Sequence, residues 1–273
     1  MIARATTYWT MLRICLEERL VYRGDFALGT LMRFLPIVTQ VFLWGAIFAS
    51  IPSGGDVAGY SYRNMIAYYL LAMVTRAFSS MPGLASGISL QIRNGEIKKF
   101  LIQPVDLLGF LLMARIAHKL VYYSIAILPF ALVFYICRDF FPGWPSAEIM
   151  TCFILSLLMA FLIGFFLEAT IGMIGFWWLE VSSLLFIYML FNFILSGHMF
   201  PIDLLEQTFL GGIARVLPLQ YLAYFPAAVF LGKVSGPELV YGMWMQFAWL
   251  VFFMVAARLT FHFGVRRYSG FGG

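Results

Sequence analysis

The stretch from residue 149 to residue 199 constrains this chain most, because it contains no Lys or Arg and only two acidic side chains, Glu168 and Glu180. A helix needs about 20 consecutive apolar residues to cross a lipid bilayer. The stretch is too long for one crossing, and Gly172 and Gly175, between the two glutamates, mark a turn. The sequence therefore predicts two consecutive transmembrane helices here.

Composition extends this prediction to the whole chain of 273 residues. Hydrophobic residues make up 62% and charged residues 11%, whereas soluble domains have about 45–50% and about 25%. We predict an all-α integral membrane protein, a single transmembrane domain over residues 1–273 with little room for a soluble catalytic domain. Its six predicted transmembrane helices cover residues 34–51, 65–90, 108–136, 149–172, 179–199 and 238–262.

Lys and Arg side chains are distributed unequally between the two sides that six spans define. Thirteen of the eighteen lie in the N-terminal segment, in or beside the loop at 91–106, or in the tail at 263–273 and just before it. Cytoplasmic loops carry such an excess, so both termini are predicted to be cytoplasmic. The turn with Glu168 and Glu180 has no basic residue and does not support this orientation. The remaining five are Arg63, Arg138, Arg215 and Lys233 on the opposite side and Arg76 inside a span.

Two segments outside the spans are predicted to lie at the membrane interfaces. The first, residues 1–33, is expected to hold a helix in the cytoplasmic interface, either a plain juxtamembrane helix or a functional elbow. Its apolar residues recur at helical spacing: Tyr8, Trp9, Leu12, Leu16 and Leu20. The second, residues 197–237, is cut by prolines into short external helices predicted over 203–216 and 219–231.

The sequence contains no recognisable catalytic or metal site. The only Gly-Lys pair, Gly232-Lys233, lacks the rest of a phosphate-binding loop, so ATP would have to bind to another chain. Ser196 and His198 invite comparison with a membrane-embedded hydrolase, but their spacing does not make a nucleophile and base. The three cysteines suggest neither a zinc site nor a disulfide framework, although Cys137 and Cys152 flank one predicted external loop.

Arg76 is the most unusual single charge. It falls near the middle of the predicted span 65–90, where insertion of an arginine costs about 2.5–3.5 kcal/mol. Two roles remain open: a structural one, and a substrate or gating one on a translocation path. Glu168 is the other intramembrane charge, but its predicted position is about 10 Å deeper at the helical rise per residue.

Small residues recur every four positions on the same predicted span, at Ser79, Gly83 and Gly87. Such a face lets two helices approach closely in a membrane. We favour helix packing over a substrate groove for this face.

The loop at residues 91–106 is the longest charged stretch between spans. It mixes Arg93, Glu96 and Lys98 with the apolar Ile97 and Phe100. A short amphipathic element of this kind suits either a cytosolic partner or anionic lipid headgroups, and the residues alone do not decide between them.

At this loop the sequence resembles a known family. Asn94-Gly95-Glu96-Ile97 and then Leu101-Ile102-Gln103-Pro104-Val105-Asp106 resemble the G-E-L…L-L-x-P-x-D stretch of bacterial ABC transporter permeases of the type-2 exporter class, and within it a subfamily of six-span permeases encoded in pairs beside an ATPase. Further matches follow in order: Leu195-Ser196-Gly197, Phe200-Pro201, Leu217-Pro218, Tyr224 with Pro226, Gly232, and the tail from Gly264 to Gly270.

The resemblance implies a half-permease in the bacterial plasma (inner) membrane that pairs with a second permease and with a separate ATP-binding subunit, which carries ATP and Mg. No nucleic-acid partner and no cofactor on this chain are expected. The residues implied to couple to the ATPase are Arg93, Gly95, Glu96, Ile97, Lys98 and Phe100. Gln103 departs from the arginine that the subfamily often has before the proline.

The function expected from these observations is ATP-driven export of an amphipathic or small-molecule substrate. A secondary transporter or channel that is not driven by ATP is the first alternative, and a membrane-embedded hydrolase is the second.

Overall fold

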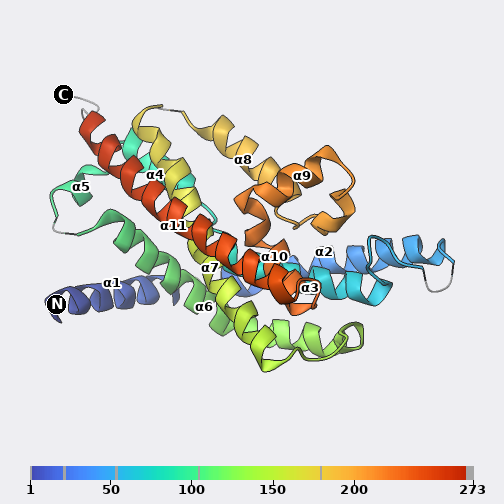
Figure 1. The fold of residues 1–273 in the computed structure, drawn as a ribbon. Coiled ribbons are helices and arrows are strands. Elements are labelled where there is room, and N and C mark those ends of the chain that lie inside the picture. Colours follow the sequence, from blue (N-terminus) through green and yellow to red (C-terminus); the bar gives the residue numbers. More distant parts are fainter. Residues whose placement is uncertain (1, 21–22, 53–54, 104, 179, 269–273) are drawn as a thin grey trace. The chain divides into compact units, whose positions relative to one another are not determined.

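The computed structural model describes residues 2–20, 23–52, 55–103, 105–178 and 180–268, and these residues form helices and no strand (Figure 1). The α-helices are α1 (Ile2–Leu20), α2 (Arg23–Ala49), α3 (Tyr62–Ser79), α4 (Leu84–Arg93), α5 (Lys98–Leu101), α6 (Leu107–Ile136), α7 (Ala147–Met173), α8 (Ser182–Leu195), α9 (Phe209–Val216), α10 (Tyr224–Phe230) and α11 (Gly236–Arg267). Short 3₁₀ helices are η1 (Arg138–Phe140), η2 (Ile174–Phe176), η3 (Ile202–Leu205) and η4 (Pro218–Leu222).

The chain divides into two compact units, the first made of residues 1–43 and 98–139. In this unit α1 packs against α6, and Phe34 of α2 meets Phe130 of α6 edge to face at 5.2 Å between ring centroids. Asp106 caps α6 by accepting a 2.8 Å hydrogen bond from the Gly109 N–H. The Tyr8 hydroxyl lies close to Gly109, since a Cβ added at Gly109 would be 2.8 Å from the hydroxyl oxygen. Asp106, the last residue of the L-I-Q-P-V-D motif, therefore fixes the start of α6, close to the place where α1 packs on α6.

The second unit, residues 44–97 and 140–273, is built around α7. Glycines along α7 and η2 let the backbone of α3 and α4 approach. A Cβ at Gly164 would overlap the Ser79 carbonyl, and one at Gly172 would lie 2.6 Å from the carbonyl oxygen of Ala85. These helices are therefore in backbone contact, as small residues allow in membranes.

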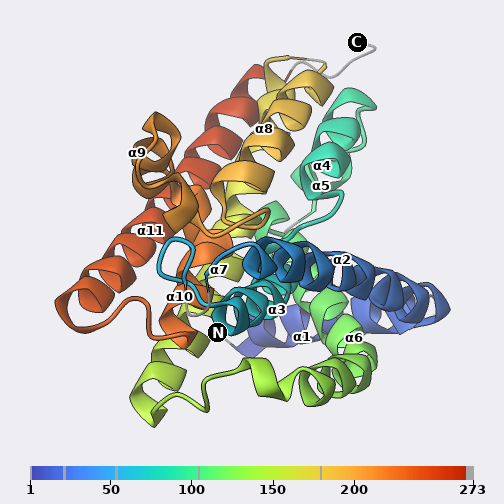
Figure 2. The ribbon, with the colours of Figure 1, turned by 90° about the vertical axis from the view of Figure 1, so that its right-hand side faces the viewer.

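The contacts define a parallel arrangement of helices that are not consecutive in the chain (Figures 1 and 2). Gly164 faces Ser79 and Gly172 faces Ala85, so residue numbers rise together along both partners. The same holds between α7 and α11, where Ser156 contacts Gln246 and η2, just after α7, packs on Gly264. The α3–α4 line, α7 and α11 therefore all run in the same direction.

A buried polar contact joins α7 to α11. The Ser156 hydroxyl donates to the Gln246 side-chain oxygen at 2.8 Å, and the Gln246 amide donates to the carbonyls of Ser156 at 2.9 Å and Tyr221 at 3.3 Å. Both side chains are fully buried. Because the Gln246 amide finds partners for its oxygen and its nitrogen, the contact is stable away from water.

The prediction of one continuous helix over 65–90 is wrong, since the chain breaks there into α3 and α4. Ser80 is extended, Pro82 lacks an N–H, and Gly83 adopts a left-handed φ of +72°. Ser79 ends α3 against α7. A Cβ added at Gly83 or Gly87 would meet no heavy atom within 4 Å, so these two glycines do not share a packed face with Ser79.

The segment at residues 197–237, predicted to be external and called the external segment for that reason, is divided more finely than predicted. Residues 203–216 form η3 and α9 rather than one helix, because the Thr208 hydroxyl accepts from the Gly211 N–H and starts α9 afresh. Residues 219–231 form η4 and α10, separated at Ala223. The helix that contains the expected first span is longer than the span, since α2 begins at Arg23 and continues through Pro36 to Ala49, while its apolar part, Phe34–Ala49, agrees with the predicted 34–51.

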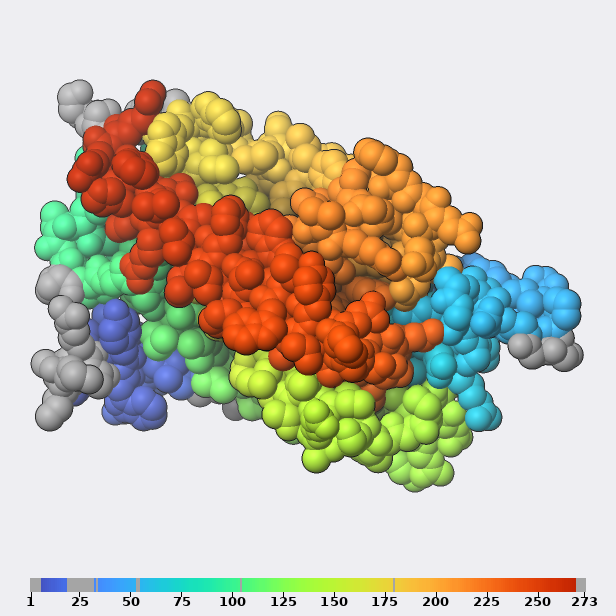
Figure 3. All heavy atoms as spheres, in the orientation of Figure 1, coloured from blue at the N-terminus to red at the C-terminus, as the bar shows by residue number. Residues whose placement is uncertain are grey.

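Among the residues that the structure describes, three helical segments are long and apolar enough to cross a membrane: Leu107–Ile136, Ala147–Phe176 and Gly236–Arg267. Shorter apolar helices cover Phe34–Ala49 and Ser182–Leu195. Along one face α11 is uncovered over most of its length (Figure 3), and Trp244 on it is 67% exposed. An apolar helix with an open apolar face is suited to contact with lipid.

We expect Gly164→Ala to destabilise the protein, although Ala is a better helix former by about 1 kcal/mol. The added Cβ meets the backbone of α3 rather than a flexible side chain, and overpacking of this kind costs about 1–3 kcal/mol. Thermal unfolding of the purified protein in detergent measures the effect. The matched control is Gly212→Ala, whose Cβ meets nothing within 4 Å. Equal melting temperatures for the two variants would contradict the backbone contact.

Candidate functional site

The turn that follows α4, here called the coupling turn (residues 94–97), has a fixed backbone. Gly95 adopts a φ of +75°, which favours glycine and ends α4. The Ile97 N–H then donates back to the Gln91 carbonyl at 3.2 Å, and the Ile97 side chain is buried. Gly95 and Ile97 therefore shape the turn, and Glu96 is held exposed at its tip.

Charged side chains flank this tip in the sequence. Arg93, Lys98 and Lys99 are exposed, like Glu96 itself. In the second unit the coupling turn thus presents the exposed Glu96 close in sequence to the exposed Arg93, and the backbone of the turn is ordered by its own hydrogen bonds. Such a surface suits a macromolecular partner with complementary charges.

Phe100 is directed onto its own unit. Its ring lies 5.3 Å from that of Phe110 on α6, and the Lys99 ammonium lies 5.3 Å from the centroid of the Phe100 ring. Ile102, two residues further, is 83% exposed. The most exposed apolar side chain of this segment is therefore Ile102, which was not predicted from the sequence because spacing alone does not separate it from Phe100.

An ion pair joins Arg93 to the turn between α7 and α8. The Arg93 Nη1 lies 3.3 Å from Oε2 of Glu180. The other oxygen of Glu180 accepts from the Ser182 hydroxyl and from the Ser182 N–H at 3.0 Å, and these bonds lower the pKa of the carboxyl below its usual value. The acidic turn that the sequence left without a basic partner thus lies at the same end as the coupling turn.

A second irregular segment follows α8, here called the α8 turn (residues 196–199). Its carbonyls accept hydrogen bonds from α3 and α10: Ser196 from the Tyr224 N–H at 2.9 Å, Gly197 from the Tyr68 hydroxyl, and Met199 from the Tyr69 hydroxyl at 3.0 Å. Tyr68 and Tyr69 lie about 10 Å along α3 from its first residue, so the α8 turn lies at that distance from the start of α3. Irregular backbone at membrane depth requires such pairing.

Gly197 is required by this geometry. Its φ is +80°, and a Cβ would lie 2.5 Å from the Tyr224 Cβ and 2.7 Å from the Tyr68 hydroxyl. The motif Leu195-Ser196-Gly197 therefore has a packing explanation, with Leu195 and Ser196 both buried. Nothing in it resembles a nucleophile paired with a base.

The α8 turn also places His198 beside Arg76. An Arg76 N–H donates to Nε2 of His198, and the ring of His198 meets Phe193 at 5.6 Å. Since a guanidinium only donates, the imidazole accepts at Nε2 and is neutral. Glu168 is at a different level, because the contacts of Gly164 and Gly172 set it beside the break after α3, about 10 Å along the axis from Arg76. Arg76 and Glu168 therefore lie at different levels along the helix axes.

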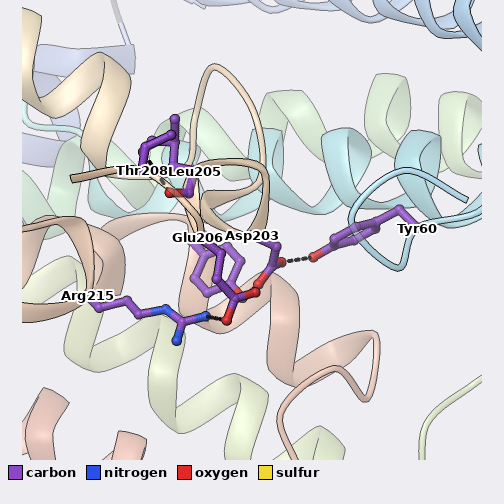
Figure 4. A network of polar contacts seen from close by, with 7 residues as sticks. Tyr60, Asp203, Leu205, Glu206, Thr208 and Arg215 are labelled. Carbon is purple, nitrogen blue, oxygen red and sulfur yellow. Dashed lines mark hydrogen bonds and ion pairs between the residues drawn. The ribbon is translucent and has the colours of Figure 1, made fainter. Parts of the chain in front are cut away.

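A polar cluster at the start of α3 ties the external segment down (Figure 4). Asp203 of η3 accepts from the Tyr60 and Tyr224 hydroxyls, both at 2.6 Å. The Lys233 ammonium lies 4.0 Å from the centroid of the Tyr60 ring and donates to the Gly59 carbonyl. Burial, followed by the neighbouring Tyr224 and Asp203, raises the pKa of Tyr60 well above its usual value. Tyr60 therefore stays a neutral donor.

The described residues offer no evident metal or redox centre. No three His, Cys, Asp or Glu side chains among them converge on one point, and neither Cys137 nor Cys152 forms a disulfide.

Comparison with known proteins identifies the chain as a transport protein. The model of a family described as "ABC-2 family transporter protein" matches residues 34–272. The chain belongs to this family and is a transmembrane permease, the membrane subunit of an ABC transporter. The resemblance to ABC-2 permeases that the sequence motifs indicate is thereby confirmed. No curated protein matches the chain.

We expect Asp203→Asn to destabilise the external segment. Asp203 accepts two phenolic hydrogen bonds, whereas an asparagine has one carbonyl oxygen and turns its amide toward the other hydroxyl; leaving a buried group unsatisfied costs about 1–3 kcal/mol. Limited proteolysis between η3 and α10, together with thermal unfolding, measures this effect. Glu206→Gln is the control, since its partner Arg215 is 54% exposed and the pair contributes little. Similar results for both variants would argue against the cluster.

Proposed function

We propose that this permease is a half-transporter that crosses the bacterial plasma membrane six times, has both termini in the cytoplasm, and exports an amphipathic or small-molecule substrate. Two such chains, identical or paralogous, pair with a separate ATPase that carries ATP and Mg. The coupling turn and its flanks, residues 91–106, transmit the ATPase cycle to the spans. This chain contributes no catalytic residue. The observation that carries the proposal is the ordered, charged coupling turn in a chain of the ABC-2 family.

The parallel arrangement supports the six-span topology. Two spans that run in the same direction must be joined through an odd number of opposite crossings. Between the α3–α4 line and α7 the chain contains α6, and between α7 and α11 it contains α8. Each of them must therefore return across the membrane, even the short α8. Helix α2 contacts α3 through the pairs Trp44–Tyr69 and Phe48–Tyr62, so the two helices are antiparallel. Counting α2 as well, the proposed number of membrane crossings is six.

The charge distribution supports the orientation. The coupling turn with its flanks and the end of α11 carry exposed Lys and Arg side chains, as cytoplasmic segments do. The ion pair between Arg93 and Glu180 favours the same side for the acidic turn before α8.

The geometry of the coupling turn supports contact with a protein rather than with lipid alone. Gly95 and the bond from Ile97 to Gln91 fix the backbone, so a partner meets a preformed surface and little ordering is needed on binding. Glu96, at the tip, is disfavoured beside anionic headgroups, whereas it fits a basic groove on a protein. Phe100 positions its segment by packing on α6, and Ile102 provides the exposed apolar contact.

The topology predicts which side each loop occupies. In a background without Cys15, Cys137 and Cys152, single cysteines at Asp56 and Trp144 should react with a membrane-impermeant maleimide added outside intact cells. Cysteines at Glu96 and Glu180 should react only after the membrane is opened. External labelling at Glu180 would mean that α8 does not cross.

We expect Glu96→Lys to weaken binding of the ATPase by about tenfold or more, because it replaces the exposed carboxylate at the tip by a cation. The measurement is co-purification of the tagged permease from its native membrane in mild detergent, with stoichiometry by mass spectrometry. Asp56→Lys is the matched control, an exposed acid in the loop before α3. Equal recovery of the ATPase with both variants would contradict docking at the coupling turn.

The same purification tests the assignment as a whole. A nucleotide-binding subunit near one copy per permease supports it, and a second six-span chain in the sample indicates a heterodimer. Isolation of the permease alone, with nucleotide present, would contradict the proposal and favour a transporter that is not driven by ATP.

A further inference from the structure

Helix α8 is attached to the α3–α4 line by polar contacts at both of its ends. Before its start, Glu180 pairs with Arg93 in the last turn of α4 at 3.3 Å. After its end, the α8 turn is bonded to α3, in part through Arg76 and His198. Both attachments are made to the same line of helices, which ends at the coupling turn.

Between these ends α8 is only weakly held. Of its described residues only Leu195 is buried. Its exposed large side chains are Phe186, Ile187, Met189, Leu190, Phe191 and Phe193. By contrast, the α3–α4 line and α7 are in backbone contact through Gly164 and Gly172. Elements with few buried contacts move at lower cost than packed ones, so within this chain α8 moves relative to α7 at lower cost than the α3–α4 line does.

Two hydrogen bonds from Ser182 orient the carboxylate of Glu180. The Ser182 hydroxyl and N–H hold one of its oxygens, which directs the other oxygen to Arg93 and keeps the carboxylate charged. Arg93 in turn precedes the coupling turn directly. The ion pair therefore connects the end of α4, beside the coupling turn, to the start of α8.

We propose that Glu180 is a positioning residue for energy coupling, whose ion pair with Arg93 makes α8 follow the coupling turn when the ATPase moves it. This inference rests on the proposed function. The side chains of Arg93 and Glu180 are 49% and 62% exposed, so the pair contributes little to the stability of the fold. Its contribution is a connection between two segments that the backbone does not join directly.

The test uses the permease assembled with its co-purified ATPase in nanodiscs. Spin labels are attached at Phe186 on α8 and Phe252 on α11, both exposed, after Cys15, Cys137 and Cys152 are replaced by serine. We expect ATP with vanadate to change the distance between the labels in the unaltered pair. Arg93→Glu and Glu180→Arg should each abolish this change. The double reversal, which restores opposite charges, should restore it, a rescue that a merely structural effect of either residue would not give.

The matched control is the pair of Glu206 and Arg215, which is also about half exposed but joins η3 to α9. Reversing either of its charges should leave the distance change intact. ATPase co-purification is recorded for every variant. If the unaltered permease binds no ATPase, the proposed function fails. If the ATPase is bound, the positioning role is overturned by any of three results: no distance change in the unaltered pair, a change that persists in the single reversals, or no rescue. Loss of ATPase binding by Glu180→Arg also overturns it, because Glu180 would then belong to the docking surface.

Discussion

The backbone contact of α7 with α3 and α4 is the constraint on which the rest of the second unit depends. Gly164 and Gly172 leave no room for a side chain, and they fix these helices in parallel at one register. That register determines which backbone carbonyls, charged side chains and loops lie at the same position along the helix axes. It separates Arg76 from Glu168, and it places η2 and the start of α8 beside the end of α4. The polar contacts at both ends of the unit complete an arrangement that the glycines define.

Much of the architecture follows from the sequence because hydrophobic content and length are local properties. The helical membrane character and the end of α7 near Gly172 and Gly175 could be predicted in this way, and the family could be predicted from short local motifs. The break between α3 and α4 could not, since Pro82 and Gly83 are common in membrane helices and a hydropathy pattern is blind to a local change of backbone direction. The division of the external segment at Thr208 depends on a single cap, which apolar spacing does not report.

Site residues are harder to predict, because contacts between distant segments determine them. The turn that contains Glu180 has no Lys or Arg of its own, unlike a typical cytoplasmic loop. The structure supplies the missing cation, because Arg93 of α4 pairs with Glu180. Asp203 and Tyr60 are separated by 143 residues, and neither lies in a recognisable motif. Gln246 and Ser156 are ordinary residues in the sequence, yet they are fully buried and bonded to each other. The motif positions themselves, such as Gly95, Asp106 and Gly197, are explained by turns and caps.

The parallel order of non-consecutive helices also has a consequence for biogenesis. As the chain leaves the ribosome, α7 can meet the α3–α4 line only after α6 has been inserted, and Ser156 has no Gln246 to bond until α11 is made. Until that moment α7 has an open apolar flank toward the lipid or the insertion machinery, and Ser156 lacks its partner on α11. The packing of α7 on α11 is therefore completed only at the end of synthesis, and a chain truncated before α11 lacks both the Ser156–Gln246 bond and the cover on that side of α7.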